Sequence, residues 1–185
     1  MPEKRETHPI EIAGISRELP LFEVAPGVRI AVLNILGDIE LVEACASALA
    51  DKLASQEYDI LVTAEAKSIP LIHSLAVKTR KPYVVLRKVY KPYMGEALSA
   101  ETHSITTGRN QCLYLDEKDR SLLAGKRVVL LDDVISTGST LRAMERLLEI
   151  NRLLYPRKDA VYVPDVKLLL ETFVSEFCEG GKQAA

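Results

Sequence analysis

The chain has 185 residues, of which 48% are hydrophobic and 27% charged, and its formal net charge at pH 7 is −2. This balance fits one globular domain, and it does not support broad nucleic-acid binding, which favours a basic surface. There is no apolar run of membrane-spanning length, and the polar start MPEKRETHPIE lacks the apolar core of a signal peptide. Cys45, Cys112 and Cys178 have neither a metal-binding nor a disulfide spacing. We therefore expect a single domain, residues 1–185, in the reducing cytoplasm, without a membrane partner.

Predicted strands and helices alternate along the chain. Short aliphatic runs predict strands at residues 28–33, 59–64, 82–88, 111–115 and 126–133. Apolar residues at helical spacing, with capping residues before them, predict helices at residues 38–53, 68–79 and 139–150. This alternation predicts an α/β fold with a mostly parallel, twisted sheet flanked by helices on both faces.

The stretch VVLLDDVISTGST, residues 128–140, joins a buried-strand pattern to two acids and a turn rich in Ser, Thr and Gly. Parallel sheets bind ligands at the carboxyl ends of their strands, and this strand would deliver Asp132 and Asp133 to that edge. The turn leads into a predicted helix, whose N-terminus offers unpaired amides to a phosphate. Carboxylates can accept hydrogen bonds from sugar hydroxyls and can bind Mg²⁺. The stretch therefore indicates a site for a phosphorylated ribose.

Two other interpretations of this stretch are weaker. A Walker loop would end in Gly-Lys-Ser or Gly-Lys-Thr, which this sequence lacks. A capped turn with two solvated acids would explain any one of these residues alone. It does not explain two acids, two apolar residues and a small-residue loop in strand–loop–helix order.

The same stretch resembles the phosphoribosyl-pyrophosphate signature of type I phosphoribosyltransferases. The resemblance covers about residues 19–148 and is closest to the adenine branch. VTAEAKSIP, residues 62–70, is similar to the pyrophosphate-binding loop, where adenine enzymes commonly carry Glu-Ala-Arg-Gly. LRKVYKPYMGEALSAE, residues 86–101, is similar to the Arg-Lys segment and mobile loop of that branch. Three motifs in the family's order imply the type I phosphoribosyltransferase fold, with a small hood formed by residues 1–35.

The resemblance implies a role for each matched residue. The ribose hydroxyls and Mg²⁺, bound directly or through water, would be held by Asp132 and Asp133. The 5′-phosphate would be bound by Ser136, Thr137, Gly138, Ser139 and Thr140. Backbone amides for the pyrophosphate would come from Ala66, Lys67 and Ser68. The charge of the departing pyrophosphate would be neutralised by Arg87, Lys88 and Lys91.

The implied reaction transfers ribose 5-phosphate from phosphoribosyl pyrophosphate to a free nucleobase and releases pyrophosphate. The sugar would become oxocarbenium-like and the leaving group highly charged, so catalysis would be mainly electrostatic. The catalytic residues would be Asp132, Asp133, Arg87 and Lys88. Residues 88–104 lack a sustained apolar period, and we expect a mobile lid that little packing holds closed without substrate. By the same resemblance we expect a homodimer.

The identity of the base depends on fewer residues. The 6-oxopurine branch usually has a third acid at the position of Ser136, so hypoxanthine and guanine are disfavoured here. Adenine enzymes usually have a small residue at that position, and adenine is the base that we expect. Xanthine and orotate enzymes also tolerate a small residue there and stay open as alternatives.

The two ends of the chain bear on a second functional class. A non-catalytic regulator could use the same pocket to sense phosphoribosyl pyrophosphate, but the purine-repressor relatives that do so carry an added DNA-binding domain. Fewer than about 30 residues precede the first predicted strand, which favours the enzyme. Residues 151–185 depart from the family's usual turn and strand, and Asp165 is expected to cap a helix over Val166–Cys178.

Overall fold

The computed structural model describes residues 6–103, 110–135 and 138–154. At its centre lies a parallel sheet in which β4 (Ile60–Ala64) is paired on one side with β5 (Tyr83–Leu86) and on the other with β8 (Val128–Leu131). Every residue of β4 is buried, as its uninterrupted aliphatic run predicts. None of the helices in these described ranges has the length and apolar character needed to cross a bilayer.

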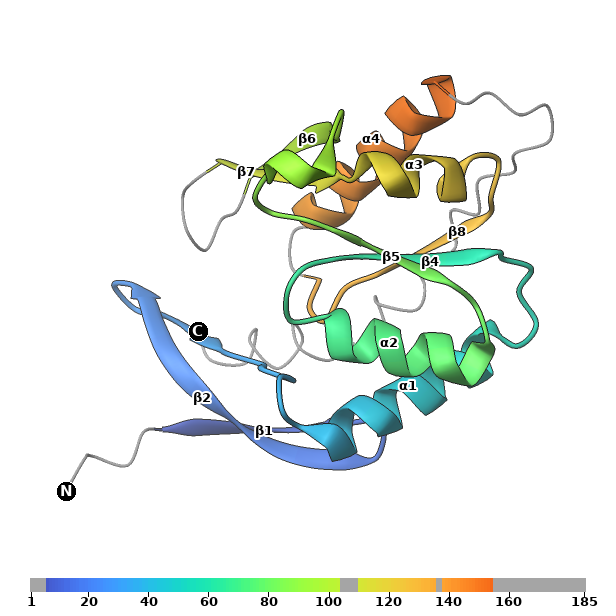
Figure 1. Cartoon of the computed structure of the whole chain (residues 1–185). Coiled ribbons are helices and arrows are strands. Elements are labelled where there is room, and N and C mark those ends of the chain that lie inside the picture. The colour runs from blue at the N-terminus through green and yellow to red at the C-terminus, as the bar shows by residue number, and fades with distance from the viewer. Residues whose placement is uncertain (1–5, 104–109, 136–137, 155–185) are drawn as a thin grey trace.

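Alternate residues of the sheet face two separate hydrophobic cores, because successive side chains of a strand point to opposite faces. Leu61 and Val129 pack with α1 (Ile39–Leu53) and α2 (Ile69–Thr79) in the first core. Val62 and Leu130 face the second core, to which α4 (Ser139–Leu154) contributes Met144 and Leu147. Figure 1 shows α1 and α2 on one face of the parallel sheet and α4 on the opposite face. The predicted α/β fold with a helix-flanked parallel sheet is thus confirmed.

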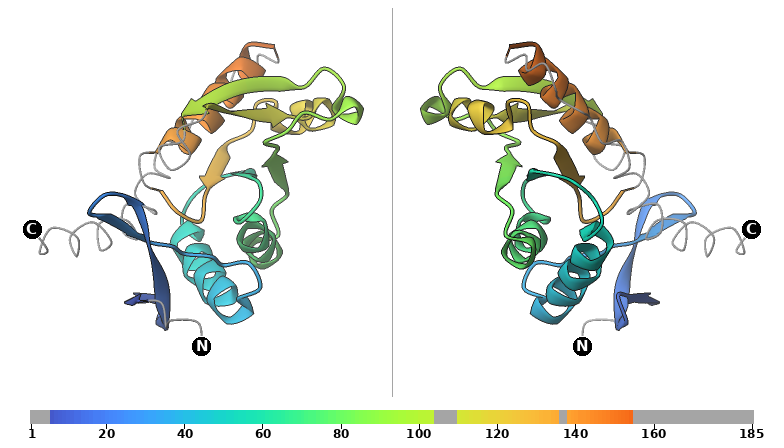
Figure 2. Two further views of the ribbon diagram at one scale, coloured as in Figure 1. Left: turned by 90° about the vertical axis from the view of Figure 1, so that its left-hand side faces the viewer. Right: turned by 90° about the vertical axis from the view of Figure 1, so that its right-hand side faces the viewer.

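The N-terminal residues form an antiparallel sheet of their own. Its strands are β1 (Thr7–Ile12), β2 (Ile15–Ala25) and β3 (Val28–Ala31). The predicted strand at 28–33 is therefore four residues long and belongs to this sheet rather than to the parallel one. The reason is the turn between β2 and β3, where Gly27 has a φ of +73° and reverses the chain. Figure 2 shows this sheet beside α1 in both side views.

A second antiparallel pair covers the α4 side of the parallel sheet. It consists of β6 (Leu98–His103) and β7 (Asn110–Leu115), and a bridge between Arg87 and Tyr114 connects it to the end of β5. Helix α3 (Glu117–Leu123) follows, and Asp116 caps it by accepting a hydrogen bond from the amide of Lys118 at 3.1 Å. Asp116 is buried, although the run 116–120 has the composition of a solvated face.

The mobile lid expected over residues 88–104 stays a prediction: most of its described residues are exposed, but two points of the segment are packed against the rest of the fold. A short 3₁₀ turn, η1 (Pro92–Met94), buries Met94 to 1% exposure, and β6 buries Ala100 to 5%. Gly95 follows at a φ of +59°, and a Cβ there would lie 1.9 Å from Oε2 of Glu117. That carboxylate accepts the amide of Glu96 at 2.8 Å, so the turn is fixed against α3.

Candidate functional site

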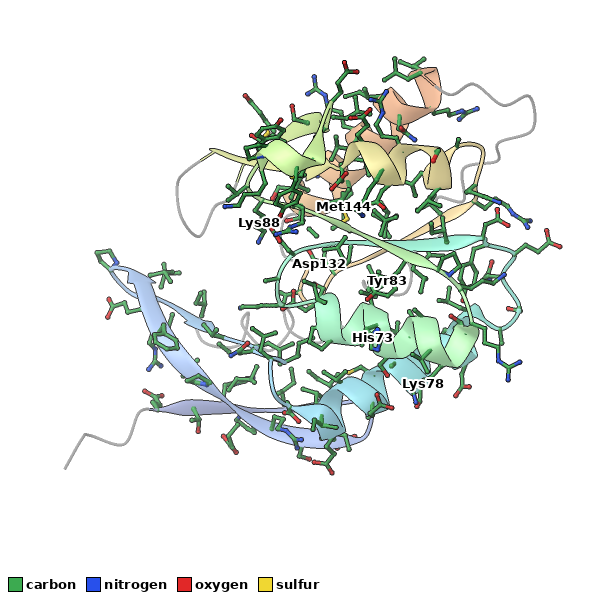
Figure 3. The ribbon with its side chains drawn as sticks, viewed as in Figure 1. His73, Lys78, Tyr83, Lys88, Asp132 and Met144 are labelled. Carbon is green, nitrogen blue, oxygen red and sulfur yellow. The ribbon has the colours of Figure 1, made fainter. Side chains whose placement is uncertain are left out.

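The site is assembled where the three parallel strands end. Glu65 follows β4, Arg87 follows β5 and Asp132 follows β8, and the strand register places these ends at one edge of the sheet. In Figure 3 the labelled Lys88 and Asp132 both lie at this edge. The hydroxyl of buried Thr63 donates a hydrogen bond to the carbonyl of Leu131 at 2.7 Å and ties β4 to the end of β8.

Asp132 and Asp133 meet a third group, the hydroxyl of Ser68. The Oγ of Ser68 lies 2.9 Å from Oδ1 of Asp132 and 3.0 Å from Oδ1 of Asp133. The amide of Asp133 donates to the same Oγ at 3.0 Å, and Oδ1 of Asp132 is also 3.0 Å from that amide. Ser68 thus forms one hydrogen-bonded cluster with two aspartates that follow it by 64 and 65 positions in the chain.

Burial changes the protonation of this cluster. Burial, which costs the charged form its hydration, and then the negative charge of Asp133 together raise the pKa of Asp132 to about 7. The hydrogen bond from Ser68 opposes this rise. Near neutral pH, Asp132 is therefore divided between its charged and its protonated form. A cation or a hydrogen-bond donor arriving at the pair would favour the charged form.

The loop after β4 connects the acidic cluster to the basic residues at the end of β5. Its Glu65–Ala66 peptide bond is cis. The carboxylate of Glu65 forms an ion pair with Arg87 and accepts the amide of Lys88 at 2.6 Å. The hydrogen bond and charge of Glu65 raise the pKa of Arg87, whose guanidinium is charged at neutral pH. Glu65 does not pair with the neighbouring Lys67, whose ammonium group donates to the carbonyl of Leu33 at 3.3 Å.

The predicted pyrophosphate loop presents its amides at the start of α2. In the described part of the chain, the amides of Ala66, Lys67 and Ser68 have no hydrogen-bond partner. Ala66 and Lys67 are exposed, whereas Ser68 is buried. Ile69 and Pro70 begin the helix. The N-terminal end of α2 thus offers donors and partial positive charge beside the acidic cluster.

The predicted phosphate loop lies only partly within the described residues. Ser136 and Thr137 lie outside them. Gly138 has a φ of +70°, and its carbonyl accepts the amide of Arg142, which starts α4. Ser139 and Thr140 are half-buried in the first turn of that helix. The glycine is required by its backbone angle, because a Cβ would come no nearer than 3.8 Å to Arg142.

The two predicted lysines take different positions. Lys88 is exposed beside Arg87 at the edge of the sheet, and Lys91 is exposed before η1, where its amide lies 3.3 Å from the sulfur of Met94. Among the described contacts, neither ammonium group reaches the acidic pair. Ser68 joins the predicted loop 66–68 to Asp132 and Asp133 by hydrogen bonds. Glu65, which directly precedes that loop, contacts Arg87 and Lys88, while no described contact joins Lys91 to the acidic pair.

Sequence reasoning missed two contributions to the site. Glu65 was not predicted to hold Arg87 and Lys88, and Ser68 was predicted to contribute its amide but not its hydroxyl. A sign for Ser68 was present, because the adenine enzymes that the loop resembles commonly have Gly at this position. A hydroxyl in the place of a glycine needs a partner when it is buried.

Comparisons with known proteins agree with this arrangement. Residues 32–153 match the model of the phosphoribosyl transferase domain. The chain is 35% identical over 124 residues to a hypoxanthine/guanine phosphoribosyltransferase of Methanococcus maripaludis strain C5, with 67% of this chain and 60% of that protein covered. It is 29% identical over 126 residues to the purine biosynthesis transcriptional repressor PurR of Bacillus subtilis, with 68% of this chain and 44% of that protein covered.

A solved structure shows the same fold. The adenine phosphoribosyltransferase of Rhodothermus marinus has a TM-score of 0.54 and 26% identity, with 72% of this chain and 74% of that chain covered. Because the domain model matches more than half of its length, the chain belongs to the phosphoribosyl transferase family. The family resemblance seen in the sequence is thus confirmed. The chain spans 44% and 60% of the lengths of the repressor and the Methanococcus enzyme.

Proposed function

We propose that this protein is a purine phosphoribosyltransferase, which transfers ribose 5-phosphate from phosphoribosyl pyrophosphate to a free purine and releases pyrophosphate. One observation carries the proposal: at the edge of the parallel sheet, the acidic pair 132–133 is bonded to the loop that carries the free amides 66–68. An acceptor pair beside a cluster of donors is what a ribose joined to a pyrophosphate requires. Membership of the family supports the same substrate.

Each part of the site has a role in this proposal. Asp132 and Asp133 accept hydrogen bonds from the ribose hydroxyls. Gly138 and the first turn of α4, with the predicted residues Ser136 and Thr137, bind the 5′-phosphate through backbone amides. The amides 66–68 hold the pyrophosphate, and Arg87, oriented by its ion pair with Glu65, stabilises the negative charge that develops as the pyrophosphate departs.

The acidic pair also fits a magnesium ion. Mg²⁺ in enzymes is commonly bound through one or two carboxylates together with phosphate oxygens of the substrate. Asp132 and Asp133 are two such carboxylates, and within the described ranges no group of three or more acid, His or Cys side chains could form a protein-only metal site. The ion, when bound, would neutralise charge on the pyrophosphate. Asp132 and Asp133 would hold it directly or through water.

Adenine is the base that we propose. Ser136 cannot supply the acid that the 6-oxopurine branch usually has at this position, and the Rhodothermus structure is that of an adenine enzyme. The similar Methanococcus protein is named a hypoxanthine/guanine enzyme, so adenine is to be compared directly with these two bases.

The decisive experiment is a spectrophotometric assay with phosphoribosyl pyrophosphate and Mg²⁺. Adenine, hypoxanthine, guanine, xanthine and orotate are offered separately, and nucleotide formation is followed by absorbance and chromatography. We expect adenine to give the highest kcat/KM and pyrophosphate to appear in equal amount. Faster conversion of another base would overturn the choice of adenine, and no conversion of any base would overturn the transferase.

A second candidate function is supported by the similarity to PurR. In this alternative the same pocket binds phosphoribosyl pyrophosphate as a signal and catalyses nothing. The two functions separate in one pair of measurements. A ligand-induced rise in melting temperature without conversion of any of the five bases would favour the sensor, whereas turnover would exclude a purely sensory site.

We also propose that the protein forms a homodimer, as the family resemblance implies. Sedimentation-equilibrium centrifugation at micromolar concentration should give twice the mass of the 20.5 kDa chain. A monomer at all concentrations tested would refute this.

A further inference from the structure

Ser68 is the N-cap residue of α2, a position at which a serine side chain usually accepts a hydrogen bond from a backbone amide of the helix. Here the side chain makes no capping hydrogen bond. It is also 1% exposed, so solvent does not take the place of the cap. The hydroxyl has been directed away from the helix toward another partner.

That partner is the acidic pair. Oγ of Ser68 is 2.9 Å from Asp132 and 3.0 Å from Asp133, and it accepts the amide of Asp133 at 3.0 Å. A hydroxyl has one proton, so it donates to one carboxylate at a time while it accepts the amide. The orientation of both aspartates is therefore fixed relative to Ser68, the residue that precedes α2.

The hydroxyl is a feature of this chain rather than of the motif. The loops that EAKS, residues 65–68, resembles commonly have Gly where Ser68 stands, and a glycine has no side chain to hold the acidic pair. The substitution Ser68→Gly therefore restores the residue that is common in such loops and removes only this hydroxyl-bearing side chain.

We propose that Ser68 is a positioning residue that joins the pyrophosphate loop to the acidic pair through its side chain. Binding of the pyrophosphate at the amides 66–68 and binding of the ribose at Asp132 and Asp133 then share one rigid connection. This inference rests on the proposed function, because it assumes that the amides 66–68 and the acidic pair bind the pyrophosphate and the ribose of the same substrate molecule.

The effect belongs mainly to substrate binding. Ser68 touches the groups that hold the ribose, whereas Arg87 at the end of β5 acts on the departing pyrophosphate. Removing the hydroxyl leaves the aspartates with one hydrogen bond fewer and more freedom. We expect Ser68→Ala and Ser68→Gly each to raise the KM for phosphoribosyl pyrophosphate roughly tenfold, as the loss of one hydrogen bond to a charged group does, with a smaller change in kcat.

The control is a second buried serine of the same helix. Ser74 is 8% exposed, and its hydroxyl bonds to Glu43 on α1 rather than to the acidic pair. Ser74→Ala therefore removes a buried hydroxyl from α2 without touching the site. Ser68→Thr keeps the hydroxyl and should retain a KM nearer to that of the parent than Ser68→Ala does.

KM, kcat and melting temperature are measured for the parent and all four variants at saturating Mg²⁺. A KM that rises in Ser68→Ala and Ser68→Gly but not in Ser74→Ala supports the proposal. A KM unchanged within twofold in Ser68→Ala, or raised equally in Ser74→Ala, overturns it while the parent's turnover still supports the transferase. Should the parent convert no base, the transferase fails, and the same variants are compared by the melting-temperature shift that phosphoribosyl pyrophosphate induces. An equal shift in parent and Ser68→Ala, or no shift in the parent, then overturns the role of Ser68 as well.

Discussion

Two aspartates of this protein stand at the ends of structural elements, yet their environments are opposite. Asp38 caps α1, and the guanidinium of Arg17 beside it lowers the pKa of its carboxyl to about 2. Asp132 ends β8, where burial and the neighbouring Asp133 raise its pKa to about 7. The fold supplies a cation to the first carboxylate and a second acid to the other. An acid that the protein itself leaves short of positive charge is suited to a ligand that brings it.

The largest effect should come from removing the charge of the two aspartates that we propose to bind the ligand. Asp132→Asn and Asp133→Asn should each lower turnover on the order of a hundredfold or more, because acceptors for ribose and Mg²⁺ are lost. Asp38→Asn is the matched control and should keep the parent's turnover while it lowers the melting temperature. Turnover near the parent's value in both site variants would show that the acidic pair is structural.

A second test compares two glycines with positive φ. Gly138 has a φ of +70° before α4, and Gly14 has a φ of +79° in the turn between β1 and β2. Valine at either position should lower the melting temperature because of strain. Gly138→Val alone should also abolish the shift that phosphoribosyl pyrophosphate induces. A normal shift in Gly138→Val would remove this turn from the phosphate site.

A smaller loss is expected for the exposed lysines. Lys88→Ala and Lys91→Ala should lower kcat about tenfold with little change in stability, because their charge acts as the pyrophosphate departs. Lys126→Ala, an exposed lysine before β8, is the control and should have no effect on kcat. No described contact joins Lys91 to the acidic pair, which makes Lys91 the sharper test. If only Lys88→Ala is impaired, Lys91 has no role.

The smallest effect is on the pH dependence of stability, measured in EDTA without substrate. The folded-state pKa of Asp132 is about 7, above its ordinary value of 3.8, so its contribution is fully present below about pH 4 and is lost as pH rises through 7. The folded-state pKa of Asp38 is about 2, so its contribution is present above about pH 4 and is lost as pH falls through 2. Asp132→Asn should therefore melt at a higher temperature than the parent at pH 8, and Asp38→Asn at a lower one. If Asp132→Asn melted below the parent at pH 8 and Asp38→Asn above it, the assigned pKa shifts of both aspartates would be wrong.

Much of the fold could be predicted because its long elements follow a clear period. The predicted face of α1, from Leu41 to Leu53, is the face that packs in the first core. Other elements escaped prediction, among them the strands β1 and β2 of the N-terminal sheet. β6 reads LSAETH and is mostly polar, α3 has only seven residues, and the antiparallel pairing of β3 is set by a turn rather than by its own aliphatic residues. The predicted helix at 166–178 lies outside the described residues.

The candidate site could be predicted where chemistry and position coincide in one short stretch. Asp132 and Asp133 follow a buried strand directly, so their place at the sheet edge follows from the sequence. The contacts of Ser68 and Glu65 could not be predicted, because each joins residues from separate strands. Glu65 reaches Arg87 only because β4 and β5 are paired in a register that places their ends together.

The two cores on opposite faces of the parallel sheet have a consequence for how this sequence can change over generations. Leu61 and Val62 are neighbours in the chain, but each is packed against a different set of partners. A volume-conserving apolar exchange at one of them is accommodated by the partners on its own face. Each layer can therefore drift in composition independently, while the hydrogen-bonded register of three strands keeps the ligand-binding edge in place.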